Sequence, residues 1–316
     1  MDKELSNLLG SLQKRYFSEK KKYVDTERIF WTPVELVVTS FPESRIESDR
    51  WVRAHGKISL NMSQLEPERS VPYGILAREM FEYFFNEYVT NLNNGVQEPS
   101  VFSFSSASEL FNKVKGNCSG TRVSQDQRIL ILEMLLNFES CAIRFTKCLS
   151  ENSVVSRNDL FFRSYKGPKH DKVKGMPSST TSGEILIQLD DITFYKFSES
   201  TRVPTKSFIA KLAGANVMAR DLSIVIARLC YSLVKRNTDY QVLGNTELRM
   251  YLGKPNECTV KKFNKDLKRA VELLKKNYET AFPFDEYPAS LISPKRGELQ
   301  LLVTKPSQPD NILACG

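Results

Sequence analysis

Three observations predict a helix-rich α+β chain with tandem winged-helix domains, each of which is built around a helix-turn-helix. Two stretches repeat one pattern, in which a short helix, a glycine turn and a longer amphipathic helix follow one another. A β-hairpin pattern comes after the second copy. The chain is also basic, with 45 Lys and Arg against 37 Asp and Glu and a net charge of +8. Because a helix-turn-helix can place its second helix in the DNA major groove, these observations together indicate a protein that binds duplex DNA.

The first copy of the pattern covers residues 106–116 and a helix that opens at about Ser124. Glutamine and arginine near the start of such a helix are residue types that hydrogen-bond the edges of adenine and guanine. An ordinary solvated helix end explains the same residues equally well. The candidate DNA-contacting residues of this copy are Arg122, Ser124, Gln125, Gln127 and Arg128.

The second copy covers residues 245–253 and a helix from 259 to 276. Its apolar face is formed by Phe263, Leu267, Ala270, Val271 and Leu274, and cations run along both flanks. Lysine-rich faces are usually only solvated. Here a turn precedes the helix, a hairpin follows it and the cations concentrate in its first three turns, which favours DNA binding. The candidate contacts are Thr259, Lys261, Lys262, Lys265, Lys268 and Arg269.

Residues 289–303 contain two strand-like runs joined through residues 294–297, Pro-Lys-Arg-Gly. This pattern predicts a β-hairpin, and a hairpin after a helix-turn-helix is a wing. We expect Lys295 and Arg296, at its tip, to contact the DNA backbone.

The length of 316 residues suits two domains. Leucines at positions 5, 8, 9 and 12 give the N-terminus one apolar helical face, which either packs on its own domain or forms a dimer contact. The segment from 166 to 183 is rich in Gly, Pro, Ser, Thr and Lys and reads as a flexible basic loop or linker. The predicted division is an arm (1–30), a first winged-helix domain (31–165), the linker or loop (166–183), a second winged-helix domain (184–308) and a tail (309–316).

Further elements follow from periodicity. Alternation predicts strands over 34–39, 57–62 and 184–189. A strongly apolar helix starts at 72–74 and carries an aromatic stripe through Phe85, which we interpret as core packing and not as a surface for stacking bases. The helix from 219 to 234 is predicted to be mostly buried.

Several function classes lack support in the sequence. No apolar run is long enough to cross a membrane and no signal peptide is evident, so we expect a cytoplasmic protein. Cys141 and Cys148 fall in an apolar pattern that we interpret as helical, where reduced thiols pack as small hydrophobes; neither zinc nor disulfides are indicated. His55 and His170 have no metal-ligand spacing, and no Walker loop or dinucleotide turn occurs. We therefore expect no enzyme activity, cofactor or metal.

An ordered series of blocks resembles the plasmid-encoded RepA replication initiators over about residues 50 to 308. The blocks in the first half are residues 51–62, 71–78 and 106–111, and those in the second half are residues 191–197, 202–204, 219–231, 263–267 and 297–302.

This resemblance implies tandem winged-helix domains that bind repeated origin sequences and recruit host replication proteins. The predicted function is therefore plasmid replication initiation in the bacterial cytoplasm, by binding double-stranded origin repeats and assisting duplex opening. The predicted partners are double-stranded DNA, host replication proteins and a second copy of the chain. A winged-helix transcriptional repressor is the alternative. A rolling-circle nicking enzyme is the enzymatic rival, and the missing histidine pair counts against it.

Overall fold

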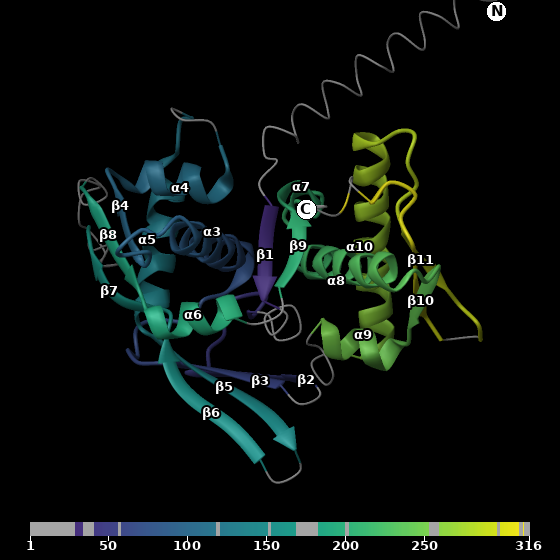
Figure 1. Cartoon of the computed structure of the whole chain (residues 1–316), viewed down its shortest axis with the longest axis horizontal. Coiled ribbons are helices and arrows are strands. Elements are labelled where there is room, and N and C mark those ends of the chain that lie inside the picture. Colours follow the sequence, from purple (N-terminus) through teal and green to yellow (C-terminus); the bar gives the residue numbers. More distant parts are fainter. Residues whose placement is uncertain are drawn as a thin grey trace, which may run out of the picture. The chain divides into compact units, whose positions relative to one another are not determined.

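The computed structural model describes residues 29–33, 41–55, 58–117, 121–150, 153–168, 183–199, 202–252, 259–295, 298–309 and 312. The chain divides into two compact units. We call Pro33–Arg202 the first unit, and Val203–Gly316 together with Met1–Thr32 the second unit. Both contain helices and sheets, which agrees with the predicted α+β class (Figure 1). The leucines of the predicted arm and the strand expected over 34–39 lie outside the described residues.

The first unit is built on three helices and a three-stranded antiparallel sheet. Strand β8 lies in the middle of this sheet and is hydrogen-bonded to β4 and β7. The elements are α3 (Gly74–Asn93), β4 (Val101–Phe104), α4 (Ala107–Lys115), α5 (Gln125–Glu139), β7 (Phe162–Lys166) and β8 (Ile185–Leu189), followed by α6 (Asp191–Glu199).

The second unit repeats this plan. Its elements are α8 (Val217–Arg236), β10 (Tyr240–Leu243), α9 (Asn245–Tyr251), α10 (Val260–Ala281), β11 (Ala289–Ile292) and β12 (Gln300–Thr304). Strand β12 lies between β10 and β11, and both pairings are antiparallel. Before them come β9 (Arg202–Lys206), which pairs with β1 (Ile29–Pro33), and α7 (Ser207–Lys211).

Both units therefore follow the order helix, strand, helix, helix, strand, strand, with the last strand in the middle of the sheet. The two predicted helix pairs are confirmed as α4 with α5 and α9 with α10, while Gly253, the turn glycine of the second pair, lies outside the described residues. The first copy is clearest at its caps: the Ser106 side chain accepts a hydrogen bond from the Glu109 amide, and Gly116 ends α4 in the left-handed conformation with a φ of 64°.

The first unit differs by an insertion between α5 and β7. The hairpin formed by β5 (Cys141–Ser150) and β6 (Ser153–Leu160) extends a sheet that also contains β2 (Arg50–His55) and β3 (Ile58–Gln64), in the order β2-β3-β5-β6. Side chains alternate across this antiparallel sheet, so that one face buries Leu60, Met62 and Ile143. The second unit has no corresponding hairpin within its described residues.

An aromatic cluster fills the core of the first unit. Phe81, Phe84 and Phe85 of α3 are buried, which confirms the interpretation of the aromatic stripe as packing. The ring of Phe81 lies 5.7 Å from that of Phe194 on α6, and the ring of Phe138 on α5 lies 5.2 Å from that of Phe161. Phe161 also lies 6.0 Å from Phe81, so α5 and α6 meet α3 in one apolar core.

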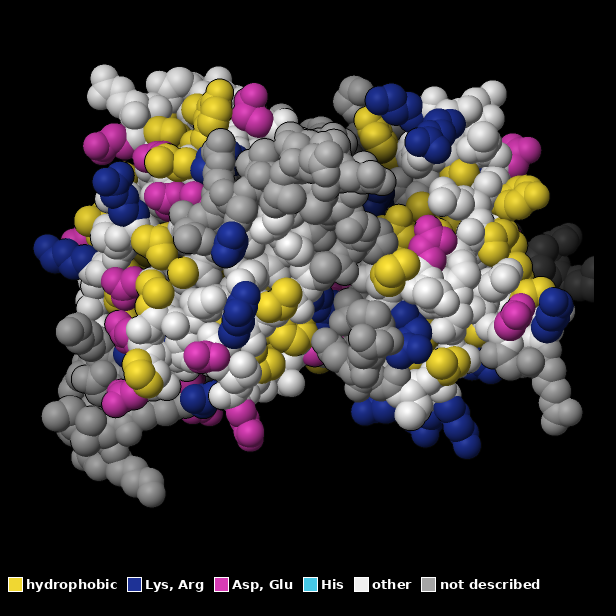
Figure 2. Space-filling model, turned by 90° about the horizontal axis from the view of Figure 1, so that it is seen from below, with side chains coloured by type: hydrophobic (Ala, Val, Ile, Leu, Met, Phe, Trp, Pro, Cys, Tyr) yellow, Lys and Arg dark blue, Asp and Glu magenta, His cyan; other side chains and the backbone are white. Residues whose placement is uncertain are grey.

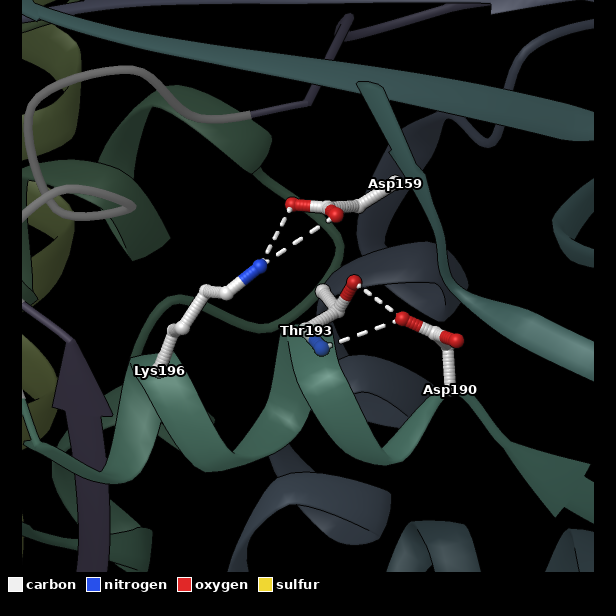
Figure 3. A network of polar contacts seen from close by, with 4 residues as sticks. All are labelled: Asp159, Asp190, Thr193 and Lys196. Carbon is white, nitrogen blue, oxygen red and sulfur yellow. Dashed lines mark hydrogen bonds and ion pairs between the residues drawn. The ribbon is translucent and has the colours of Figure 1, made fainter. Parts of the chain in front are cut away.

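Polar contacts fix the start of α6 and attach it to the inserted hairpin (Figure 3). The carboxylate of Asp190 accepts hydrogen bonds from the backbone N–H and the hydroxyl of Thr193, at 3.0 and 2.7 Å. These bonds satisfy an otherwise unpaired amide in the first turn. One turn later, the Lys196 amino group lies 3.4 Å from the Asp159 carboxylate of β6. The helix is therefore held by its cap, an ion pair and its phenylalanines.

The predicted domain boundary at 184 is wrong. Strand β8, which was assigned to the second domain, pairs with β4 and β7, and Phe194 of α6 packs on α3. The boundary lies at Arg202 instead. Strands β7 and β8, which precede and follow the segment 166–183, are neighbours in one sheet, so this segment does not separate the two units. Residues 169–182 lie outside the described part.

The second unit is organised by the contact between α8 and α10. Most of α8 is buried, as predicted, including Leu222, Val225 and Leu229. At the other end of α10, the Tyr278 hydroxyl donates to the Asp285 carboxylate, which also accepts a hydrogen bond of 2.5 Å from Ser307. This network connects the end of α10 to the segment after β12.

The structure corrects the secondary structure that was predicted for two cysteines. Helix α5 ends at Glu139, and Cys141 and Cys148 lie on strand β5, not in a helix. The strand follows because the helical apolar pattern ends with Phe138 and an alternating one begins. Cys141 is nevertheless buried as expected, while the side chain of Cys148 lies outside the described part. Burial raises the pKa of the Cys141 thiol to about 12, and it does the same for Cys230 on α8.

This burial predicts low reactivity for both thiols. Thiolate is the nucleophilic form, so a pKa of about 12 leaves almost none of it at pH 8. We expect Cys141 and Cys230 to resist iodoacetamide at pH 8 in the folded protein and to be alkylated after unfolding in guanidinium. Peptide mass spectrometry resolves each site. Rapid alkylation of either cysteine in the folded protein would contradict the packing described above.

Candidate nucleic-acid interface

Helix α10 owes its orientation to a sharp division between apolar and charged side chains. Phe263, Leu267, Ala270, Val271 and Leu274, the predicted apolar face, are all buried. The helix begins at Thr259, whose hydroxyl accepts a hydrogen bond of 3.3 Å from the Lys262 amide. Thr259 was expected to contact DNA, and the structure gives it a capping role at the exposed end of the helix.

The opposite side of α10 carries the predicted cations, and all of them are exposed. They are Lys261, Lys262, Lys265, Lys268 and Arg269. Lys261, Lys265 and Lys268 recur at i, i+4 and i+7, a spacing that places them on one side of the helix. A hollow follows this side and is lined by Val260, Lys261, Asn264, Lys265, Lys268 and Arg269.

These cations are not engaged in ion pairs within the described residues, although Asp266 shares the same stretch of helix. The second half of α10 behaves differently: Lys275 and Glu279 pair at 3.6 Å, and Glu272 alternates with the lysines. Like charges at i, i+4 repel by a few tenths of a kcal/mol in water. A cluster of this kind therefore creates a field suited to a polyanion.

Figure 2 shows the types of side chain on one face of the molecule. Lys and Arg side chains gather in several groups towards the right of this view, with a few Asp and Glu side chains among them.

Helix α9 is attached to the start of α10 by two contacts. The guanidinium of Arg249 lies over the Phe263 ring at 5.9 Å. The side-chain amide of Asn245 donates a hydrogen bond of 2.5 Å to Oδ1 of Asn264. Asn264 therefore sits in the hollow with one of its two polar atoms already engaged.

The predicted hairpin after α10 is present as β11 and β12, which pair in antiparallel register with Leu291 opposite Leu301. The Ser293 hydroxyl donates a hydrogen bond of 2.7 Å to the Glu298 carbonyl and so bridges the two ends of the connection. Lys295 is exposed there, as expected of a tip residue. Arg296 lies outside the described residues.

The equivalent helix of the first unit, α5, exposes fewer of its side chains than α10 does. From Ile131 to Glu139 none of its side chains is exposed, and the predicted contacts lie at its N-terminal end. Arg122, Ser124 and Gln127 are exposed, while Gln125 and Arg128 are half-buried. The structure thus brings these five residues together around one helix end.

Local hydrogen bonds occupy much of this helix end. The Ser124 hydroxyl accepts from the Gln127 amide at 3.2 Å, and the Gln127 side-chain oxygen accepts from the Ser124 amide at 2.9 Å, a capping box. Arg128 donates to the Gln125 side-chain oxygen at 2.5 Å. The carbonyl oxygens of both glutamines are therefore engaged, and a glutamine needs its oxygen as well as its amide for bidentate pairing with adenine. Capping is the role that the structure supports for Ser124 and Gln127.

Among the described residues, no group of three His, Cys, Asp or Glu side chains is placed to hold a metal ion. No helix in the described part is long and apolar enough to cross a membrane.

Comparison with known proteins identifies structures of similar fold but no related sequence. No protein-family model and no curated protein sequence matches the chain. Among solved structures, a selenomethionine crystal structure of domains 2 and 3 of RctB aligns at 11% identity with a TM-score of 0.51, over 85% of this chain and 97% of that one. A second crystal structure of RctB domains 2–3 aligns at 12% identity with a TM-score of 0.47, over 89% and 97%. The first alignment shows that the chain shares its fold with these RctB domains.

The capping box allows a stability test at the first helix end. We expect Ser124→Ala to lower the free energy of unfolding by about 1 kcal/mol, because the Gln127 amide loses its acceptor. Chemical denaturation followed by circular dichroism measures this change. Arg122→Ala is the matched control, since Arg122 is exposed and lies outside the cap; it should leave stability unchanged. Equal stability of the two variants would contradict the capping role.

Proposed function

We propose that this chain initiates plasmid replication by binding double-stranded origin repeats through tandem winged-helix domains. In this proposal α9 and α10 form a helix-turn-helix in the second unit, and β11 and β12 form its wing. Helices α4 and α5 with strands β7 and β8 form the corresponding parts of the first unit. The repeated element order and the matching strand order of the two sheets support this assignment.

The observation that carries the proposal is the exposed cation cluster on α10. Five cations in three turns, with no ion pair among the described residues, match the phosphates that flank a major groove. Their placement follows from the helix pair before them and the hairpin after them, which is how such a domain docks on DNA. Because α5 exposes no side chain from Ile131 to Glu139, the first unit would form fewer of the contacts with DNA.

Similarity to two groups of replication initiators supports the replication role. RctB is a bacterial replication initiator, and this chain shares the fold of its domains 2 and 3. The series of sequence blocks that resembles the RepA initiators points to the same class and to a plasmid origin. The chain would act in the bacterial cytoplasm, with host replication proteins and a second copy of itself as further partners. It would help to open the duplex by binding, without covalent chemistry of its own.

Footprinting on the DNA that flanks the coding region tests the proposal. We expect regularly spaced protection over direct repeats, because an initiator occupies an array of sites. A single protected inverted repeat would favour a transcriptional repressor with the same fold. Absence of any protected site at low salt would overturn the DNA-binding proposal itself.

Replacing Lys261, Lys265 and Lys268 by alanine tests α10 directly. We expect the triple variant to bind the protected DNA at least about tenfold more weakly, with the slope of log affinity against log salt reduced by about three, because each lost phosphate contact removes about one unit. Thermal melting should not change, since all three side chains are exposed and form no ion pair among the described residues. Fluorescence anisotropy at several salt concentrations measures the binding.

The matched control is Lys235→Ala, Arg236→Ala and Lys276→Ala in one chain. It removes the same charge from exposed positions of the same unit. Its affinity should fall much less than that of the first variant. An equal loss in both would mean that α10 offers only general charge and no defined contact surface.

A further inference from the structure

Asn264 is the one neutral polar side chain that lines the hollow on α10, where its neighbours are four cations and Val260. On a helical wheel it falls between the buried stripe and the lysines, and its side chain is half-buried. It lies one turn after Val260, within the first two turns of the helix, where a groove-binding helix contacts base edges.

The hydrogen bond from Asn245 changes what Asn264 can recognise. Oδ1 of Asn264 accepts from the Asn245 amide at 2.5 Å, and no described residue accepts a hydrogen bond from the Asn264 amide nitrogen. One lone pair of Oδ1 is therefore used within the protein, and the N–H groups of the Asn264 amide are donors left for a ligand in the hollow. An unconstrained asparagine pairs with adenine by donating to N7 and accepting from the N6 amino group. The second of these bonds could use only the remaining lone pair of Oδ1, in the orientation that the bond to Asn245 imposes.

We propose that Asn264 is a specificity-determining residue that donates to the major-groove acceptors of guanine, and that Asn245 positions it for this choice. Guanine presents two acceptors, N7 and O6, and no donor on that edge. Both N–H donors of the amide are satisfied there, whereas at adenine one of them would face the N6 amino group unless Oδ1 accepted a second hydrogen bond. The inference rests on the proposed function, because it assumes that α10 lies in a major groove.

The fixed geometry assigns different roles to the two asparagines. Asn264 touches the base. Asn245, at the first position of α9, acts through Asn264 by holding its amide group in one orientation. Removing Asn245 releases Oδ1 of Asn264, so the amide recovers the donor and acceptor pair that suits adenine.

Selection from a random-sequence duplex DNA library, followed by sequencing of the bound fraction, tests this inference. We expect the full-length parent to select a motif with one position at which guanine is favoured over adenine by about tenfold or more. Asn264→Ala should lose this preference while it keeps the rest of the motif. Asn245→Ala should shift the same position from guanine towards adenine, with an unchanged salt slope. Lys268→Ala, the control from the same hollow, should weaken binding to all sequences alike.

The outcomes separate the two proposals. If the parent selects no motif, the proposed sequence-specific function fails. If the parent selects a motif and Asn264→Ala selects the same motif with equal strength at every position, the role of Asn264 is overturned while DNA binding stands. If only Asn245→Ala leaves the motif unchanged, its positioning role is overturned. Melting curves that match the parent's show that each variant is folded.

Discussion

The apolar stripe of α10 is the constraint on which the rest of the second unit depends. Phe263, Leu267 and Leu274 are fully buried, and each contributes roughly 1.5–3 kcal/mol by leaving water. A rotation of the helix by one residue, about 100°, would bring lysines into the core at a far greater cost. The packing of the buried face therefore fixes the orientation of α10, and this orientation determines where the exposed cations point.

Much of the fold was predictable because its signals are local. The apolar spacing of α3, α8 and α10 and the caps at Ser106 and Gly116 each involve residues within a few positions of one another. The partner of β8 was not predictable in this way. Its hydrogen bonds reach β4, more than 80 residues earlier, and alternation alone does not say which sheet a strand joins. This non-local pairing moved the domain boundary to Arg202.

The same distinction governs the candidate interface. The wheel of α10 identified its lysines, because a helix that buries one side must expose the other. It could not identify Asn264, since the feature that distinguishes it is a hydrogen bond from a residue 19 positions away on another helix. At α5 the residue types predict base contacts for Gln125 and Gln127. The sequence did not indicate that short-range bonds with Arg128 and Ser124 engage the side-chain oxygens of both glutamines.

The two units show how one plan can be used in two ways. In the first, α5 is buried over most of its length, and an inserted hairpin extends a second sheet that is tied to α6 through Asp159 and Lys196. In the second, the equivalent helix leaves five cations exposed, at some expense in mutual repulsion. Packing gains nothing from that repulsion. In the function proposed above, duplex DNA would offset it, because DNA carries one negative charge about every 1.7 Å along its axis.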